Sequence, residues 1–244
     1  MIQPDQHEHT HEHGPHTHEH HDHHDWHSAA YSREWMDRWE RRPSREEQFS
    51  AAVKLLPFQQ DEHFVLMDIG AGFGAFAAYI LERYPKAEAI LVDYSQAMLD
   101  LAKEQQQAYA GRLIYEQIDL SSPHCLEPLQ SAGASLAVSA IAIHNLRDPQ
   151  LIQGVYAQVA ACLQTPGYFI NLDYVLANQR EADLYYRKLE AMADPSKADR
   201  VGRVPNFPGT ARDQLQWLAA SGFDWADIPW KQGPLSLLFA VKGS

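Results

Sequence analysis

The sequence predicts an α/β fold, a doubly wound and mostly parallel sheet of seven strands that ends in an antiparallel hairpin. From residue 64 onward, short apolar runs typical of buried strands alternate with segments of helical periodicity. A turn at Gly233-Pro234 joins the last two runs and predicts the hairpin. The 244 residues, 45% hydrophobic and 21% charged, suit one globular domain with an added tail.

The segment 28–57 is predicted to form two helices ahead of the sheet. The first starts near Ser32, and its aromatic and apolar side chains recur at helical spacing: Tyr31, Trp35, Met36 and Trp39. Ser44 and Glu47 form the pattern of a capping box at the start of the second helix. That helix ends at Pro57, and its apolar stripe is Phe49, Ala52, Val53 and Leu56.

The sheet domain is predicted over 58–244. Its strands are expected at 64–69, 89–93, 113–118, 135–143, 168–175, 223–230 and 235–241. Helices are expected at 74–84, 95–109, 179–192 and 210–220. Asp148-Pro149 begins a further helix, with Leu151, Val155, Val159 and Cys162 inward, and Thr165-Pro166-Gly167 stops it. Residues 194–209 contain Pro and Gly and predict an exposed loop.

Residues 1–27 differ from the rest and predict a disordered, His-rich tail. They hold 11 of the 14 histidines, six acids and no Lys or Arg, so they cannot build a core. Alternating imidazole and carboxylate groups supply ligands for Zn, Ni or Cu without fixing one geometry. The alternative to a metal-binding function is a solubilising or purification tail. The candidate ligands are His7, His9, His11, His13, His16, His18, His20, His21, His23 and His24.

Charge and composition exclude several classes of protein. A formal net charge of -12 disfavours a nucleic-acid partner, because phosphate binding needs clustered positive charge. There is no apolar run of membrane-spanning length and no signal-peptide pattern, so no membrane partner is expected. Cys125 and Cys162 form neither a disulfide framework nor a CxxC pair, which favours a reducing, cytoplasmic location. The oligomeric state is not readable from the sequence.

A glycine-rich loop, Asp68-Ile69-Gly70-Ala71-Gly72-Phe73-Gly74, lies between the first predicted strand and the next helix. Glycines there let the backbone turn sharply and approach a ligand closely. Asp93 ends the next strand, 23 residues beyond Gly70, where a carboxylate can hold ribose hydroxyls. The glycines alone also fit a dinucleotide-binding protein.

Four motifs in order at strand ends resemble those of class I S-adenosylmethionine-dependent methyltransferases: VLMDIGAGFGAFAAYI, ILVDYSQAML, EQIDL and AVSAIAIHNL. The resemblance covers roughly residues 45–243, and it implies a Rossmann-like sheet with the terminal hairpin, which a nicotinamide-binding fold lacks. It also implies that the N-terminal helices of 28–57 form a cap over the cofactor. Tyr31, Trp35, Trp39 and Arg42 are then candidate contacts.

The same resemblance implies a set of contacts to S-adenosylmethionine. Asp68 would fix the glycine loop and the amino group of the cofactor, and Asp93 would bind the ribose hydroxyls. The other implied contacts are Gly70, Ala71 and Gly72 to the methionine part, Tyr94, Met98, Ile118, Asp119 and Leu120 around the adenine, and Ser139 and Ala140 near the sulfonium. Structural alternatives are helix capping for Asp68, core packing for Met98 and a turn through Ser121 for Asp119.

The methyl acceptor is less well indicated. His144 follows the fourth strand and is the candidate general base, with packing as the alternative. Tyr174 is the second candidate catalytic residue. Candidate pocket residues are Trp39, Asn145, Asp173, Tyr185 and Arg203. Neither the acceptor nor its reacting atom follows from the sequence.

The expected function is methyl transfer to a small molecule by in-line displacement. A protein substrate is the first alternative. The second is a metal-handling or sensing protein in which the histidine tail acts and the fold is retained. Loss of metal binding without loss of methyl transfer on tail deletion would separate these functions.

Overall fold

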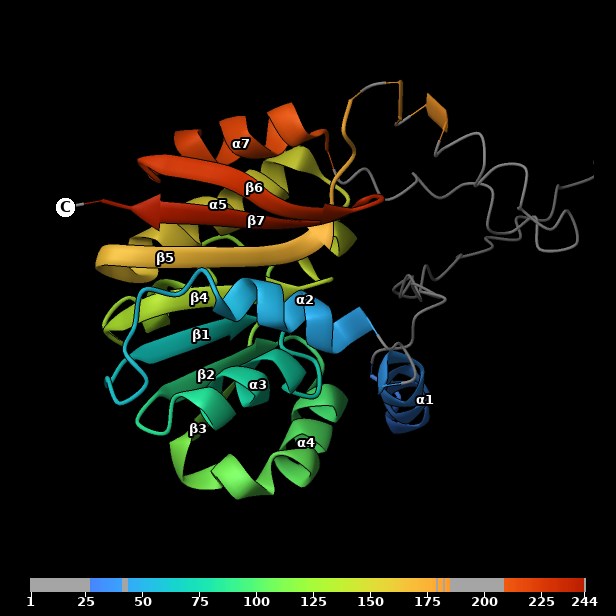
Figure 1. The fold of residues 1–244 in the computed structure, drawn as a ribbon. Helices are drawn as coiled ribbons and strands as arrows, with labels where there is room; N and C mark the ends of the chain where they lie inside the picture. Colours follow the sequence, from blue (N-terminus) through green and yellow to red (C-terminus); the bar gives the residue numbers. More distant parts are fainter. Residues whose placement is uncertain (1–26, 41–43, 179, 182, 185–208, 244) are drawn as a thin grey trace, which may run out of the picture.

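The computed structural model describes residues 27–40, 44–178, 180–181, 183–184 and 209–243. A seven-stranded sheet with the order β3-β2-β1-β4-β5-β7-β6 forms its centre (Figure 1). The strands are β1 (Val65–Ile69), β2 (Glu88–Asp93), β3 (Leu113–Gln117), β4 (Ala134–Ala140), β5 (Leu163–Tyr174), β6 (Trp225–Gln232) and β7 (Leu235–Lys242). The first five pair in parallel, and β7 is antiparallel to both β5 and β6. The predicted fold class is confirmed.

Helices cover both faces of the sheet. One face packs against α2 (Ser44–Val53), α3 (Ala75–Arg83) and α4 (Gln96–Gln105), and the other against α5 (Pro149–Cys162) and α7 (Ala211–Ala220). Alternation along β1 explains this: Leu66 belongs to the first core, and Met67 and Ile69 belong to the second. Short 3-10 turns complete the elements: η1 (Gln107–Arg112), η2 (Glu127–Leu129) and η3 (Ile143–Leu146).

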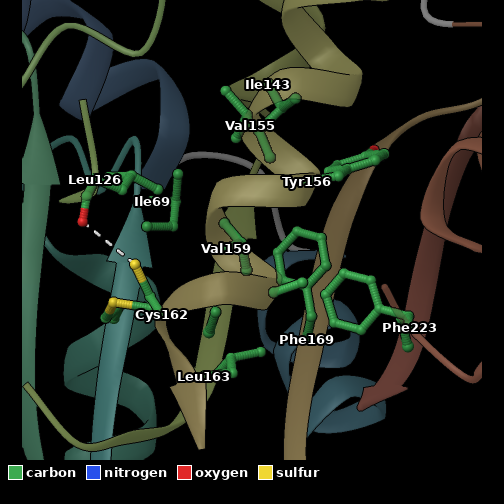
Figure 2. Packing of buried hydrophobic residues seen from close by; sticks show 14 of the residues in the cluster. Ile69, Leu126, Ile143, Val155, Tyr156, Val159, Cys162, Leu163, Phe169 and Phe223 are labelled. Carbon is green, nitrogen blue, oxygen red and sulfur yellow. Dashed lines mark hydrogen bonds between the residues drawn. The ribbon is translucent and has the colours of Figure 1, made fainter. Parts of the chain in front are cut away.

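The core on the α5 side is rich in aromatic rings. Phe169 of β5 lies between Tyr156 and Phe223, with ring centroids 5.6 Å and 5.8 Å away (Figure 2). Cys162 donates its thiol hydrogen to the carbonyl oxygen of Leu126 at 3.3 Å, and burial raises its thiol pKa to about 11. Both cysteines are free. The environment of Cys162 therefore fits packing, as the absence of a cysteine motif indicated.

Helix α1 (Ala29–Glu40) contacts α4 beside the sheet. It starts before the predicted Ser32, and Arg33 pairs with Glu104 of α4 at 3.2 Å. Helix α2 ends at Val53, so Leu56 lies after the helix and not on its stripe, although it still packs against the core. Helix α5 begins as predicted, because Asp148 caps the Gln150 amide and Pro149 occupies the first turn.

Three boundaries differ from the prediction. The fourth strand stops at Ala140 because Ile141 has a positive φ of 55°, which a strand cannot continue. The predicted helix 95–109 is divided into α4 and η1. Strand β5 starts at Leu163, so the Thr165-Pro166-Gly167 segment lies inside the strand and not in a loop. The predicted helix 179–192 and loop 194–209 lie largely outside the described residues.

The topology fixes where a ligand can bind. The neighbours of β1 are β2 on one side and β4 on the other, so the strand order reverses there. At such a point the connections leave in opposite directions and open a crevice beyond the carboxyl ends of the strands. The glycine loop begins directly after β1, at this edge. Among the described residues, no helix has the length and apolarity needed to cross a membrane.

Candidate functional site

A cavity of about 440 Å³ lies beyond the carboxyl ends of the parallel strands, at the glycine loop. Its walls come from the glycine loop, the ends of β2 and β4, the segments after β3 and η3, and helix α1. Thirteen residues predicted as cofactor or acceptor contacts line it: Trp35, Trp39, Asp68, Gly70, Ala71, Gly72, Asp93, Tyr94, Met98, Asp119, Leu120, Ala140 and Asn145. Residues from six separate segments of the chain therefore meet at one cavity.

Asp93 holds the glycine loop. Its Oδ2 accepts the Gly72 amide hydrogen at 2.8 Å, and its Oδ1 accepts the Ser95 amide hydrogen at 2.9 Å. The resemblance implies the loop-fixing role for Asp68, whereas Asp68 Oδ2 accepts the Ala77 amide hydrogen at 3.1 Å in the first turn of α3. The helix-capping alternative for Asp68 is thus present. Each carboxylate keeps lone pairs beyond these bonds for a ligand.

The loop itself needs glycine. Gly70 has φ +69°, and a Cβ built on it would lie 2.4 Å from Cβ of Ala142. Gly72 has φ +55°, and a Cβ there would meet nothing within 4 Å. Gly70 therefore permits close packing against the β4 side, while Gly72 leaves open space over the backbone, where a ligand can approach.

Burial shifts the carboxyl groups toward their neutral forms. The pKa of Asp68 is raised from 3.8 to about 7, mainly by burial, with the Ala77 amide opposing and the charge of Asp93 adding to the shift. Burial also raises the pKa of Asp93, although the amides of Ser95, Gly72 and Tyr94 lower it. Such perturbed groups at the mouth of a crevice are typical of a functional site.

The Asp68 shift predicts a pH dependence of stability. Between about pH 4 and 7 the folded protein keeps a proton on Asp68 that the unfolded chain has lost, so stability falls as pH rises, by up to about 1.4 kcal/mol per pH unit. The contribution is complete below the unfolded pKa and is lost as pH passes the folded pKa. Asp68→Asn keeps an acceptor for Ala77 and cannot ionise, so its slope should be flatter. Urea unfolding at about pH 5 and about pH 7 measures both slopes, and equal slopes would contradict the prediction.

Asp119 and Met98 also make the structural contacts that were the alternatives to cofactor binding. Asp119 Oδ1 accepts the amide hydrogen of Ser121 at 2.9 Å and its hydroxyl hydrogen at 2.7 Å, which is the predicted turn. Met98 is 1% exposed and belongs to α4. Both nevertheless line the cavity. A structural contact and a place in the wall are therefore compatible at these positions.

Two predicted cofactor contacts do not line the cavity. The hydroxyl of Ser139 donates to the carbonyl oxygen of Ile69 at 2.7 Å, so it joins β4 to β1 beneath the site. Ile118 packs against the core on the α5 side, and its amide donates to the carbonyl oxygen of Asp93 at 3.0 Å. Both support the strand ends that carry the wall.

His144 and Asp173 form a buried pair beside the cavity. His144 Nδ1 lies 2.6 Å from Asp173 Oδ1, but the atoms are not aligned for a hydrogen bond, so the contact is a close polar one. The other oxygen, Oδ2, accepts the backbone amide hydrogen of His144 at 3.0 Å. The Tyr174 ring meets the imidazole edge to face, with centroids 5.1 Å apart. None of the three lines the cavity.

Aromatic rings of α1 close one side. Trp35 and Trp39 line the cavity, and Phe73 of the glycine loop meets Trp39 edge to face at 6.2 Å. The Arg45 guanidinium lies 3.9 Å over the Trp39 ring and holds it against α2. Two rings of α1 are thus part of the cavity wall, while the cap over the cofactor stays a prediction for 28–57. Tyr185, Arg203, Arg42 and the histidines of residues 1–24 lie outside the described residues.

Comparison with known proteins finds a family model that matches part of the sheet domain. Residues 66–167, from β1 into β5, match the family model of a methyltransferase domain. This segment is therefore similar to methyltransferase domains. The match covers the elements that build the cavity wall from β1 to α5.

A curated relative and solved structures agree with this similarity. The chain is 34% identical over 86 residues to a demethylmenaquinone methyltransferase of Chlamydia pneumoniae, and that segment spans 35% of each protein. An O-methyltransferase family protein of Burkholderia thailandensis has a TM-score of 0.66 at 14% identity, over 88% of this chain and 60% of that one. Human N-acetylserotonin methyltransferase, solved with S-adenosylmethionine, has a TM-score of 0.63 at 15% identity, over 89% and 57%. At these identities the two structures bear on the fold alone.

Part of the cavity wall was not predicted from the sequence. The residues not predicted are Phe73, Ala75, Phe76, Ser121, Ile141, Ala142, Leu146, Arg147 and Leu151. Leu151 was expected to face the core of α5 and lines the cavity instead. Ile141 and Arg147 have positive φ values of 55° and 58°, which no local sequence pattern predicts. Asp148-Pro149 was the available signal, since a helix start after a strand places the preceding residues at the crevice.

Proposed function

We propose that this protein transfers a methyl group from S-adenosylmethionine to a small-molecule acceptor. The observation that carries the proposal is the set of carboxyl groups, without a cation, on the cavity side of β1, β2 and β3. Asp68, Asp93 and Asp119 line it there, and no Lys or Arg of the described residues does. Such a surface suits the sulfonium and amino groups of S-adenosylmethionine, and it disfavours the pyrophosphate of a dinucleotide.

The proposed donor contacts follow the arrangement of the wall. Asp93 would accept hydrogen bonds from the ribose hydroxyls, and Asp68 one from the donor's amino group. The glycine loop leaves space over Gly72 for the methionine part. The adenine would lie among the remaining donor-side residues, Tyr94, Met98, Asp119 and Leu120, with Ala140 toward the sulfonium. The sequence predictions for Ile118 and Ser139 reduce to support of the strand ends, since neither lines the cavity.

The donor supplies a methyl group already activated by positively charged sulfur. The work left to the chain is to align donor and acceptor and to exclude water. Trp35 and Trp39 of α1 cover the cavity with apolar surface, and Asn145 adds a polar group after β4. A covered cavity of this size fits a small acceptor better than a protein chain.

For an acceptor that must lose a proton, His144 is the proposed base, and Asp173 would orient it. His144 is 8% exposed and does not line the cavity. It can therefore contact the acceptor only through the exposed part of its imidazole ring. The pH–rate profile of His144→Gln tests this role. Loss of the fall in rate at acid pH supports a base, because protonation of His144 would no longer limit the reaction, and an unchanged profile with lower stability supports a packing role for His144 and Tyr174.

The metal-binding tail remains a separate proposal. In the described part of the chain, no group of three or more His, Cys, Asp or Glu residues could hold a metal ion. The histidines of residues 1–24 stay the predicted ligands for Zn, Ni or Cu. Deleting them and measuring metal binding and methyl transfer in parallel tests whether the two are linked.

Calorimetric titration of S-adenosylmethionine and S-adenosylhomocysteine, with metal chelated, tests the proposed function. We expect micromolar binding of both, because the cavity and its carboxylates are preformed. Absence of binding by the intact protein would overturn the donor assignment. Binding would justify a screen of small acceptors, with peptides included as the competing class of acceptor.

A further inference from the structure

A single arginine stands out in the cavity wall. Arg147 follows η3 and lines the cavity together with Asn145, Leu146 and Leu151. Its Nε is buried and has no hydrogen-bond partner among the described residues, while the residue as a whole is partly exposed. A buried guanidinium nitrogen without an acceptor is costly, so such an atom is typically hydrogen-bonded in the working state of a protein.

The backbone holds Arg147 in place. Its φ is +58°, a left-handed conformation that costs a residue with a side chain about 1–2 kcal/mol. Its amide donates to the carbonyl oxygen of His144 at 3.2 Å, and the amide of His144 donates to Asp173 of β5 at 3.0 Å. The turn that carries Arg147 is therefore fixed to the sheet. A strained residue that the surrounding structure over-determines points to a functional position.

Charge separates two halves of the cavity. The three carboxylates of the wall follow β1, β2 and β3, whereas Arg147 follows β4, on the other side of β1 in the strand order. It is the one Lys or Arg that lines the cavity in the part of the chain that the structure describes. A methyl donor with a sulfonium adds positive charge to the same enclosed space. The carboxyl groups on the other side would face that sulfonium, so an anion beside Arg147 would pair with the guanidinium.

We infer that Arg147 binds an anionic oxygen group of the methyl acceptor, a carboxylate or a phosphate ester. This inference rests on the proposed function. The guanidinium presents several N–H donors in a planar fork that matches both groups. Leu146 and Leu151 beside it supply apolar surface, and Asn145 supplies a polar contact. The acceptor class is thus an acid with an apolar body adjacent to the charged group.

The test uses the full chain saturated with S-adenosylhomocysteine and three probes of one shape: benzoate, phenyl phosphate and benzamide. Saturation-transfer NMR titrations give the three dissociation constants for the wild type, Arg147→Gln and Arg147→Lys. Arg212→Gln is the matched control, because Arg212 is exposed on α7 and does not line the cavity. The better of the two anions identifies the group.

We expect at least one anion to bind the wild type and the Arg212→Gln variant about tenfold more tightly than benzamide. Arg147→Gln should remove this preference, and Arg147→Lys should keep part of it. No preference for an anion in the wild type, or the same preference in Arg147→Gln, would overturn the inference.

The donor is the competing ligand for Arg147, since its methionine part also carries a carboxylate. Calorimetry of S-adenosylhomocysteine on the free proteins separates the two. We expect Arg147→Gln to bind it within about twofold of the wild type, and a loss of tenfold or more would assign Arg147 to the donor and overturn the inference. Failure of the wild type to bind S-adenosylhomocysteine would instead overturn the proposed function.

Discussion

Replacing Asp93 by alanine is expected to lower the affinity for S-adenosylhomocysteine by about 100-fold or more. The carboxylate would accept hydrogen bonds from two ribose hydroxyls, and a bond to a charged group contributes about 1.5–3 kcal/mol. The same side chain holds the Gly72 amide at 2.8 Å, so its removal also releases the loop beneath the donor. Calorimetric titration at constant pH and salt measures the change.

Two further variants separate these effects. Asp93→Asn keeps one oxygen acceptor for the backbone amides and loses the charge, so it should bind the ligand more weakly than the wild type and remain better folded than Asp93→Ala. Asp61→Ala is the matched control, because Asp61 is exposed in the segment before β1, at the opposite edge of the sheet. Wild-type affinity in Asp93→Ala would remove the donor-binding role. A drop in Asp61→Ala would show that net charge, not position, controls binding.

The fold followed from the sequence because its signals are local and repeated. Each parallel strand is an apolar run buried on both faces, as in Leu66–Met67 of β1, so strand positions could be predicted within a few residues. The ends of the strands were harder to predict from the sequence. Ile141 stops β4 through its backbone conformation, and β5 begins before its apolar run because Leu163 pairs with Ala134. Pairing of this kind depends on the neighbouring strand and not on the residues themselves.

The candidate site divides in the same way. Asp68, the glycine loop and Asp93 could be predicted because they sit at fixed offsets from strand ends. The exchange of contacts between Asp68 and Asp93 could not, since Ala77 and Gly72 are positioned by the turn geometry. Arg147 was missed because a positive φ carries its side chain to the cavity from a stretch that looks like a helix start. A side chain's direction at such a residue is a property of the folded chain.

Gly70→Ala is expected to destabilise the protein by about 2–5 kcal/mol. A left-handed backbone costs a residue with a Cβ about 1–2 kcal/mol, and overpacking adds about 1–3 kcal/mol. The clash is with Cβ of Ala142 at 2.4 Å, an atom fixed to the backbone that cannot rotate away. Urea unfolding gives the change in the free energy of unfolding.

Gly72→Ala is the matched variant two residues further on. It has the same strained φ but meets nothing within 4 Å, so it should cost only the backbone part, about 1–2 kcal/mol. Its methyl group would project into the space proposed for the donor. The loss of binding free energy for S-adenosylhomocysteine should therefore exceed the loss of unfolding free energy. Gly154→Ala, in α5 with open space around it, should be neutral or stabilising and controls for the substitution itself.

The pair distinguishes a loop shaped for packing from one shaped for a ligand. If both glycines serve packing alone, Gly70→Ala and Gly72→Ala lose stability to different extents, and the folded Gly72→Ala protein binds the donor like the wild type. If the open space over Gly72 belongs to the donor, the folded variant binds it poorly. Because the two positions share a backbone conformation and differ in what lies above it, the difference between them isolates the ligand's volume from the strain of the turn.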